Sequence, residues 1–374
     1  MHQQFRALAL ADLHLGCPRL DPLIFQACIE EYVIPRITRE ISHVFICGDF
    51  FDLLINMSSI ASLVATSIIS RLKQVCFENG VKLRVLRGTH THERNQTKHF
   101  LVSAPQFNDC VRLFEELAIE YDESTGMHFL YIPDNLKYAD INEEVEKLLQ
   151  AHALKSVDVV IHHGYFKHML PPGIPEPSGT LDYNKFCKFF TGCVLNGHVH
   201  VRSIYNNVVS IGSFDRMAYG EEEAKGFYQI NREDNGVYTF EFIENKHAQL
   251  FVTIDIREFS CDDLRSAIDW VKQKLPARTK TARPIHVRLL SDDTALVEGV
   301  KTVLMEEGGD IIVDRGATTK REQLIENLML DLSELVEITP DNLQDLLLPI
   351  IQKQHPEITP EEVKLVLDEL KGTK

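Results

Sequence analysis

Five short clusters of aspartate and histidine lie in the first 200 residues, and each follows an apolar run. Asp12 and His14 come first, at a spacing that points both side chains to the same side of an extended backbone. The other four are Gly48-Asp49-Phe50-Phe51-Asp52, Gly88-Thr89-His90-Thr91-His92-Glu93, Ile161-His162-His163-Gly164 and Asn196-Gly197-His198-Val199-His200. Imidazole and carboxylate ligands together favour manganese, iron or zinc. The clusters therefore predict a metal centre.

The number of candidate ligands indicates a pair of ions. Gly48 permits a sharp turn after its apolar run, and Asp49 then offers two oxygens, enough to bridge two cations. Two cations about 4 Å apart would clamp a phosphodiester, lower the pKa of a bound water and stabilise charge on the attacking and leaving oxygens. A histidine beside them, His92 or His90, is suited to protonate the leaving oxygen. The predicted reaction is hydrolysis.

Buried strands must position these clusters. Apolar runs predict strands, and stretches with helical spacing lie between them. The expected strands are Arg6–Ala11, His43–Cys47, Lys82–Leu86, Val157–Ile161 and Cys193–Leu195, and the expected helices include Pro22–Ile41 and Ser59–Asn79. Strand and helix alternate as in an α/β layer, in which ligand sites favour one edge of the sheet. All five clusters are therefore expected to meet there.

The rest of the chain has a different pattern. Alternating, β-branched segments from Ser203 to Asp255 predict antiparallel strands. A smaller unit follows, with two helices, Cys261–Leu275 and Thr294–Glu307, and two strands, Ile285–Leu290 and Ile311–Val313. Two short amphipathic segments end the chain, Asp341–Lys353 and Pro360–Leu370. We predict a first domain over residues 1–255, an accessory domain over 256–335 and a helical tail over 336–374 that is a candidate partner-binding element.

Composition narrows the class of protein. Of 374 residues, 44% are hydrophobic and 25% are charged, which excludes a disordered chain and a membrane bundle. The net charge of −16 argues against binding nucleic acid through the overall field of the protein. The eight cysteines include no C-x-x-C pair, so no zinc ribbon is expected. No apolar run approaches the roughly 18 residues of a bilayer span, and we expect a cytoplasmic protein without a membrane partner.

The five clusters together resemble the calcineurin-like metallophosphoesterase superfamily, whose pattern is D-x-H, G-D-x-x-D, G-N-H-[DE], H and G-H-x-H. The resemblance covers about residues 5–200. Two further segments, Ser210–Arg216 and Gly220–Phe227, are similar to the segment after G-H-x-H in SbcD-type (meiotic recombination eleven-like) DNA repair nuclease subunits. The resemblance implies an α/β fold, a two-sheet β-sandwich flanked by helices, with a small α+β capping domain and a helical C-terminal tail.

The resemblance also implies a ligand set. Asp49 would bridge the two ions, and Asp52 would orient a ligand. His162 is preferred to His163 because the family's ligand immediately follows the strand. The first ion would be held by Asp12, His14, Asp49 and His200, and the second by Asp49, His162 and His198.

The third cluster departs from the family pattern, because no asparagine stands in it. In one alignment His90 keeps the register, with Thr89 in place of the asparagine. In the other, two residues are inserted, so that His92 and Glu93 match the final pair and Thr91 or His90 substitutes at the metal. The second alignment is preferred because it recovers the acidic residue. The catalytic histidine is then His92 or His90.

The activity implied by the resemblance is that of a metal-dependent DNA nuclease, an exonuclease or endonuclease in DNA repair or recombination. Its cofactors would be two divalent ions, Mn²⁺ in preference to Mg²⁺. Its partners would be DNA, a second copy of the chain in a homodimer, and an SbcC-like ABC-type ATPase subunit. Candidate DNA contacts are Arg87, Arg94, Lys98 and Arg216. The alternatives are a phosphodiesterase acting on a small nucleotide and a non-catalytic scaffold with an impaired second metal site.

Overall fold

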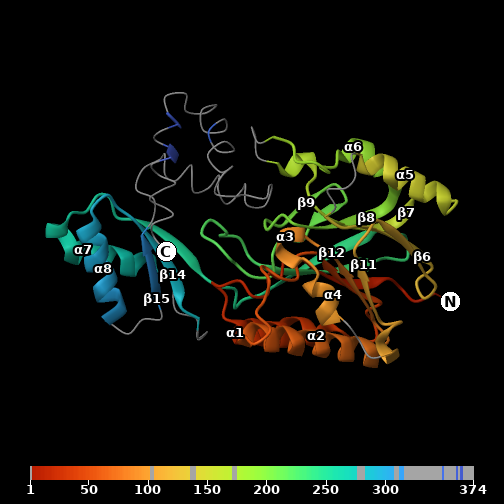
Figure 1. The fold of residues 1–374 in the computed structure, drawn as a ribbon, viewed down its shortest axis with the longest axis horizontal. Helices are drawn as coiled ribbons and strands as arrows, with labels where there is room; N and C mark the ends of the chain where they lie inside the picture. The colour runs from red at the N-terminus through yellow and green to blue at the C-terminus, as the bar shows by residue number, and fades with distance from the viewer. Residues whose placement is uncertain are drawn as a thin grey trace. The chain divides into compact units, whose positions relative to one another are not determined.

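The computed structural model describes residues 2–101, 105–134, 140–170, 175–275, 283–306 and 311–315, together with positions 348, 359, 360, 363 and 364. These residues form two compact units, and the second comprises Pro175 and the described residues from Leu250 onward (Figure 1). The domain boundary expected from the sequence lies a few residues later, at 255. Strand β13 (Phe251–Asp255) pairs with a strand of the second unit and therefore belongs to it. The predicted tail, 336–374, lies almost entirely outside the described residues.

The first unit contains two six-stranded sheets. In spatial order, the first sheet consists of β12 (Tyr238–Glu244), β11 (Gly226–Arg232), β1 (Arg6–Leu10), β2 (His43–Cys47), β3 (Lys82–Leu86) and β4 (Val111–Phe114). Strands β1 to β4 are parallel, and β11 runs antiparallel to both β1 and β12. Most residues of the parallel strands are apolar, as expected of a sheet with both faces covered.

The second sheet has the order β5 (Ala118–Asp122), β6 (Met127–Ile132), β7 (Val157–His163), β8 (Phe190–Gly197), β10 (Val208–Ser210) and β9 (Ser203–Tyr205). Its four central strands, β6, β7, β8 and β10, are parallel, and the two edge strands are antiparallel to their neighbours. Strands β7 and β8 extend to His163 and Gly197, further than the apolar runs predicted. The fourth and fifth clusters therefore begin inside the strands.

Helices cover both outer faces of the sandwich. Those of the first unit are α1 (Pro22–Cys28), α2 (Ile60–Asn79), α3 (His90–Glu93), α4 (Gln96–Leu101), α5 (Ile141–Ala151) and α6 (Tyr183–Phe186). Short 3-10 helices span Ile34–Arg36, Pro105–Phe107, Lys167–Met169 and Cys187–Phe189, and a π-helix spans Ile29–Val33. Figure 1 shows α1 and α2 along the first sheet and α5 and α6 along the second. The single helix predicted over Pro22–Ile41 is therefore wrong: it is broken into three pieces, and Pro35 lies in the last of them.

The longest helix, α2, shows how local signals fix the boundaries. The Ser59 hydroxyl accepts the backbone N–H of Ser62 and caps the first turn, and Gly80 ends the helix in a left-handed conformation with φ of 71°. Among the residues that the structure describes, α2 alone is long and apolar enough to cross a membrane by length and composition. Its residues Val64, Ile68 and Leu72 are buried against the first sheet, as in a core helix.

Three apolar cores hold the first unit together. The core between the two sheets includes Phe45, Phe129 and Ile161, all fully buried or nearly so. A second core joins the first sheet to α1 and α2, and a third joins the second sheet to α5 and α6. The result is a two-sheet sandwich flanked by helices, as the family resemblance implied.

The second unit is built separately from β13, α7 (Leu264–Lys274), β14 (Ile285–Leu290), α8 (Thr294–Glu306) and β15 (Ile311–Arg315), with a 3-10 turn at Cys261–Asp263. Its three strands are parallel and alternate with the helices, so this unit is α/β in type, where an α+β unit was expected. The parallel pairing of β13 also corrects the expectation that Ser203–Asp255 is antiparallel throughout. Strand β10, parallel to β8, is a second exception.

The inter-sheet core gives a stability prediction. Ile161 is 1% exposed in that core, whereas Ile204 on the edge strand β9 is 49% exposed. Ile161→Ala should lower the free energy of unfolding by about 2–5 kcal/mol, because it removes buried methyl groups and leaves a cavity. Ile204→Ala should change it by less than about 0.5 kcal/mol. Guanidinium chloride unfolding followed by circular dichroism measures both, and equal losses would contradict this account of the core.

Candidate metal centre

The carboxyl ends of β1, β2, β3, β7 and β8 bring all five clusters together. Four residues there adopt positive φ without being glycine: Asp12 at 49°, His14 at 45°, Asp49 at 46° and His198 at 84°. Such backbone is costly for residues with a Cβ and gathers at functional sites. The side chains of Asp12, His14 and Asp49 are also almost fully buried. The chain therefore holds polar residues, in strained conformations and away from water, at one point.

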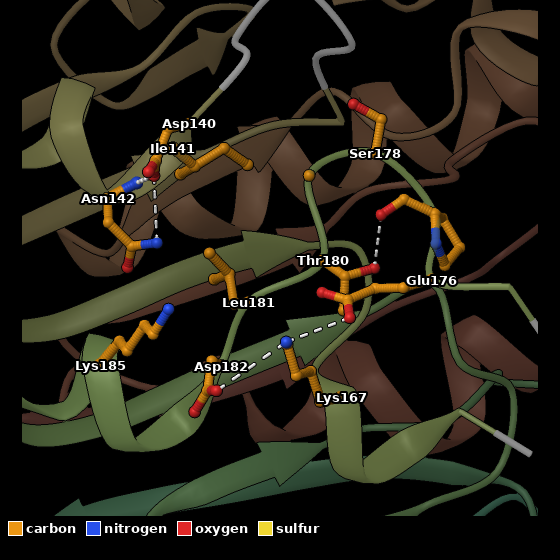
Figure 2. A pocket seen from close by; sticks show the side chains of 12 residues that line it. Asp140, Ile141, Asn142, Lys167, Glu176, Ser178, Thr180, Leu181, Asp182 and Lys185 are labelled. Atoms are coloured by element: carbon orange, nitrogen blue, oxygen red, sulfur yellow. Dashed lines mark hydrogen bonds and ion pairs between the residues drawn. The ribbon is translucent and has the colours of Figure 1, made fainter. Parts of the chain in front are cut away.

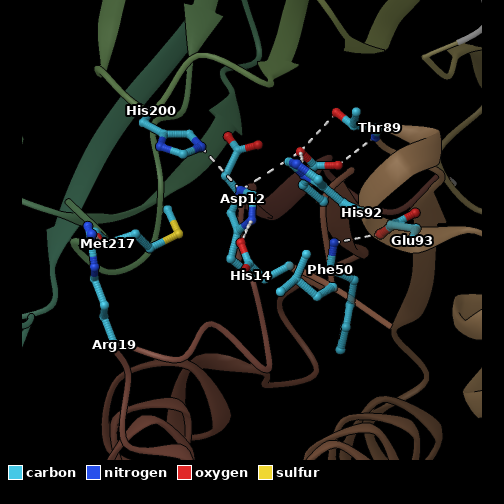
Figure 3. Close-up of polar contacts among 12 residues, drawn as sticks. Asp12, His14, Arg19, Phe50, Thr89, His92, Glu93, His200 and Met217 are labelled. Carbon is cyan, nitrogen blue, oxygen red and sulfur yellow. Dashed lines mark hydrogen bonds and ion pairs between the residues drawn. The ribbon is translucent and has the colours of Figure 1, made fainter. Parts of the chain in front are cut away.

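The first group of candidate ligands is Asp12, His14 and His200, whose ligand atoms all lie within 4.8 Å of one another (Figure 3). His14 Nδ1 lies 3.0 Å from Asp52 Oδ1, and His200 Nδ1 lies 3.1 Å from Glu221 Oε1. Each Nδ1–H therefore donates to a carboxylate, which leaves the Nε2 lone pairs pointing at each other across 3.1 Å. Two lone pairs at that distance repel unless a cation or proton lies between them.

The second group is Asp49, His163 and His198, whose ligand atoms meet the same limit of 4.8 Å. His163 Nδ1 donates to the carbonyl of Cys47 at 2.8 Å, so its Nε2 faces Asp49 Oδ2 at 3.4 Å. Thr89 Oγ1 lies 3.4 Å from His163 Nε2 and 3.4 Å from His198 Nδ1. This hydroxyl is a further oxygen at the position where the second group meets.

Asp49 belongs to more than one group. Its Oδ2 lies 3.1 Å from His92 Nδ1, and His14, Asp49 and His92 form a third set of clustered ligand atoms. The backbone N–H and the hydroxyl of Thr89 donate to its two oxygens at 2.5 and 3.1 Å. Buried carboxylates that face imidazole nitrogens, with three of the rings fixed at Nδ1 by an acceptor behind them, are the donor set of a transition-metal site. The residues fit metal ions.

The charges of the centre perturb its titration strongly. Burial alone would raise the pKa of Asp49, but His163 and His92 beside it hold the pKa well below the ordinary range. Burial alone would likewise lower the pKa of His163, and the charge of Asp49 instead raises it to about 10. Without a metal, His163 thus carries the positive charge that the carboxylate requires. A cation binding there would displace that proton.

Glu93 supports the centre from behind. Its side chain is fully buried, and its two oxygens accept the backbone N–H groups of Phe50 at 2.6 Å and Gly88 at 2.9 Å. Burial raises the pKa of Glu93 to about 7. The carboxyl group ties the turn after β2 to the turn after β3, and these turns carry Asp49 and Thr89.

The structure distinguishes the two adjacent histidines of β7. His163 faces Asp49 and His198, whereas His162 Nδ1 lies 2.6 Å from Asn196 Oδ1 and belongs to none of the clustered groups. Successive side chains of a strand point to opposite faces, so only one of the pair can face the centre. Burial lowers the pKa of His162 to about 3, which keeps it neutral. The rule that the ligand immediately follows the apolar run therefore selected the residue that lies outside the clustered groups of this structure.

The third cluster needs a second correction. His92 and Glu93 lie at the centre, in the positions that the alignment with an insertion gives them. His90 and Thr91, which that alignment offered as metal substitutes, are both exposed. Thr89, kept as the replacement for asparagine only in the other alignment, faces the second group. Each alignment therefore accounts for part of the arrangement.

The other predicted residues are members of the clustered groups, a residue that holds one of these members, or candidate DNA contacts. Asp12, His14, Asp49, His198 and His200 all lie in the clustered groups, and Asp52 holds His14 as expected. Among the candidate DNA contacts, the guanidinium of Arg216 donates to the backbone carbonyls of Gln249 and Glu223, and we assign it a structural role. Lys98 is exposed, and its Nζ lies 3.3 Å from Glu115 Oε2. Arg94 is exposed, and Arg87 is half-buried.

Sequence reasoning did not assign a role to three residues at or beside the centre. Asn196 is hydrogen-bonded to His162, which lies outside the clustered groups, and Asp134, which follows β6, lies near His163 and accepts the backbone N–H of His90. Glu221 orients His200 and lies in the segment Gly220–Phe227, which was noted without a role. Asn196 and Asp134 both lie at the ends of strands, and this position in the sequence could have indicated that they lie close to the centre.

A hollow elsewhere in the first unit has no such donor set. Asp140, Asn142 and Lys185 are among the residues that line its volume of about 310 Å³. Figure 2 shows Lys167 between Glu176 and Asp182, and its Nζ lies 3.1 and 3.9 Å from their carboxylate oxygens. The lining carries three acidic side chains and two basic ones and contains no histidine or cysteine.

Comparisons with known proteins give limited information. No family model and no curated protein matches the chain. One solved structure, that of nuclease MPE from Pseudomonas putida, is 15% identical with a TM-score of 0.28, over 60% of this chain and 84% of that one. Another solved structure is 15% identical with a TM-score of 0.35, over 63% of this chain and 98% of that one. Scores this low support no argument about activity.

The assignment of the second group can be tested with adjacent variants. His163→Ala should lose metal from the second group, whereas His162→Ala should keep full metal content. The latter should lower stability by about 1–3 kcal/mol, because Asn196 is left with an unpaired buried oxygen. Metal content after dialysis against Mn²⁺, measured by mass spectrometry, decides the matter. Metal lost only from His162→Ala would restore the original choice.

Proposed function

We propose that the chain is a metal-dependent DNA nuclease that hydrolyses phosphodiesters with a pair of divalent ions, Mn²⁺ in preference to Mg²⁺. One observation carries the proposal: three histidine rings are each fixed at Nδ1 by an acceptor, so that their Nε2 atoms face Asp12 and Asp49. Five clusters in the order of the calcineurin-like metallophosphoesterases supply these residues. The geometry supports that resemblance independently of the sequence pattern.

The residues divide into ligands and a proton donor. Asp12, His14 and His200 would hold one ion, His163, His198 and Thr89 the other, and Asp49 would bridge them. The bound ions would supply an activated water and stabilise negative charge on the phosphate. His92 is 21% exposed and hydrogen-bonded to Asp49, so it can reach a substrate and hold a proton for the leaving oxygen.

The narrower role rests on the sequence segments alone. We propose that the protein acts with DNA as the nuclease subunit of an SbcC–SbcD-like complex in the cytoplasm, as a homodimer with an SbcC-like ABC-type ATPase. Its support is the similarity of Ser210–Arg216 and Gly220–Phe227 to SbcD-type subunits. Arg94 and Lys98, both exposed near α3 and α4, are the candidate phosphate contacts. Such contacts position DNA without reading its sequence, so no base specificity is expected.

A specific observation favours a second candidate, the non-catalytic scaffold. Thr89 offers the second group one hydroxyl oxygen, already hydrogen-bonded to Asp49, at the position where the family carries an asparagine. A hydroxyl on a shorter side chain is a weaker metal ligand than an amide carbonyl. Loss of the second ion for this reason would leave a folded protein without hydrolysis.

The first experiment is cleavage of end-labelled linear DNA by the purified chain in Mn²⁺, with Mg²⁺ and chelator controls. Cleavage should depend on Mn²⁺ and vanish in Asp49→Ala, because that carboxylate serves both groups. Circular dichroism confirms that the variant is folded. Cleavage retained in Asp49→Ala would overturn the site. Hydrolysis of bis-p-nitrophenyl phosphate without DNA cleavage would favour a small nucleotide substrate, and fewer than two bound ions without cleavage would favour the scaffold.

The acid role of His92 predicts a pH dependence. Burial lowers the pKa of His92, but the hydrogen bond to Asp49 and the nearby negative charge together outweigh this effect and raise this pKa above its ordinary value. Turnover should therefore fall as pH rises through that pKa and the proton is lost. His92→Ala should lower kcat about 10²–10⁴-fold, keep its metal and lose this alkaline limb. His90→Ala, at an exposed position, should behave as wild type. An unchanged alkaline limb in His92→Ala would exclude the role.

A further inference from the structure

Behind the first ligand group lies a buried network of charged residues. Glu221 lies between β10 and β11, and its Oε1 accepts from His200 Nδ1 at 3.1 Å. Its Oε2 lies 3.0 Å from the ammonium of Lys225 and 3.3 Å from the backbone N–H of Met217. Both oxygens of the carboxylate are therefore occupied, so the group has a single orientation.

Lys225 is the other half of the network. Its side chain is 1% exposed, which is exceptional for lysine and costly unless every donor is paired. An ammonium has three donors, and three acceptors surround this one. They are Glu221 Oε2 at 3.0 Å, Glu223 Oε1 at 2.5 Å and the backbone carbonyl of His200 at 3.0 Å. The lysine therefore contacts the backbone of a metal ligand and the carboxylate that holds its ring.

We propose that Glu221 and Lys225 form a positioning pair that fixes the orientation and the tautomer of His200. Donation from Nδ1–H to Glu221 keeps the proton off Nε2, the atom that faces Asp12 and His14. Lys225 holds the carboxylate in place and anchors the ligand's backbone at the same time. The inference rests on the proposed metal centre and gives the segment Gly220–Phe227 a role. Such supports typically contribute about 10–100-fold in metal affinity.

The corresponding support of His14 is simpler. Asp52 accepts from His14 Nδ1 at 3.0 Å, but its side chain is 22% exposed, and water can reach it. The side chain of Glu221 is 13% exposed and is paired with a buried ammonium. Water can therefore replace a lost carboxylate at His14 more readily than at His200. The pair at His200 is the stronger constraint of the two.

The informative variant is Glu221→Gln, which keeps the shape and removes the charge. A charged donor makes the stronger hydrogen bond, so the amide oxygen will face Lys225 and the NH₂ group will face His200. Nδ1 must then accept, and the proton moves to Nε2. In metal-free protein, ¹⁵N spectra of labelled histidines, with His200 assigned through His200→Gln, should show Nδ1–H in wild type and Nε2–H in Glu221→Gln.

Metal titration is the second readout. Mn²⁺ affinity measured by calorimetry should fall about 10–100-fold in Glu221→Gln. Glu222→Gln is the matched control, because it removes the same charge from the next residue, which is exposed. It should leave tautomer and affinity unchanged. Lys225→Met should show the same loss if it folds, as judged by thermal unfolding.

The outcomes separate the inference from the proposed function. An unchanged tautomer and affinity in Glu221→Gln, with wild type binding Mn²⁺, would overturn the positioning role and leave the metal centre standing. Equal effects of Glu221→Gln and Glu222→Gln would also overturn it, because general charge would explain both. Wild type that binds no Mn²⁺ would refute the proposed function, and the tautomer measurement in metal-free protein would still decide the role of Glu221.

Discussion

The buried carboxylate of Asp49 is the interaction on which the rest of the structure depends. Only 2% of the residue is exposed, and its charge is balanced by His92, His163 and the N–H and hydroxyl of Thr89. An isolated charge at such depth would cost more than the unit's net stability, so it persists because partners from several strand ends converge on it. The same convergence defines the ligand groups. Burial of one charge thus links the stability of the sheet edge to its chemistry.

The sandwich makes this convergence feasible because its two sheets meet at the ends of β2 and β8. The His163 ring fits there because glycine stands on both sides of it: a Cβ at Gly48 would overlap the ring, and a Cβ at Gly197 would overlap the Cys47 carbonyl that holds the ring. Gly48 also adopts φ of 89°, which a larger residue rarely does. Close packing of backbone around an imidazole excludes water and fixes the direction of Nε2. This packing is accompanied by backbone strain at Asp12 and His198, which both adopt positive φ.

Support behind the ligands is as specific as the ligands themselves. His14, His163 and His200 have different acceptors, which are Asp52, the Cys47 carbonyl and Glu221, yet each ring directs Nδ1 to its acceptor and Nε2 to the centre. Three unrelated contacts thus give one ring orientation, which a cation-binding centre requires, because the metal ion binds Nε2 once that nitrogen has no proton. Ordinary buried histidines have no such requirement. His43, fully buried beside Asp122 at the other end of its strand, is an example.

The sequence by itself determined which strands carry the chemistry, since each cluster directly follows an apolar run and parallel strands end at one edge. The resemblance of its clusters to a known superfamily also implied the sandwich architecture, and the clusters contain most of the candidate ligands, among them Asp12, Asp49 and His198. Only the tertiary structure decided between His162 and His163, because both follow apolar residues and only the packing of the two sheets makes one face inward. Only the tertiary structure likewise showed that Thr89 faces the second ligand group and that Glu221 holds His200. Their contacts join segments far apart in the chain, and local spacing carries no information about such contacts.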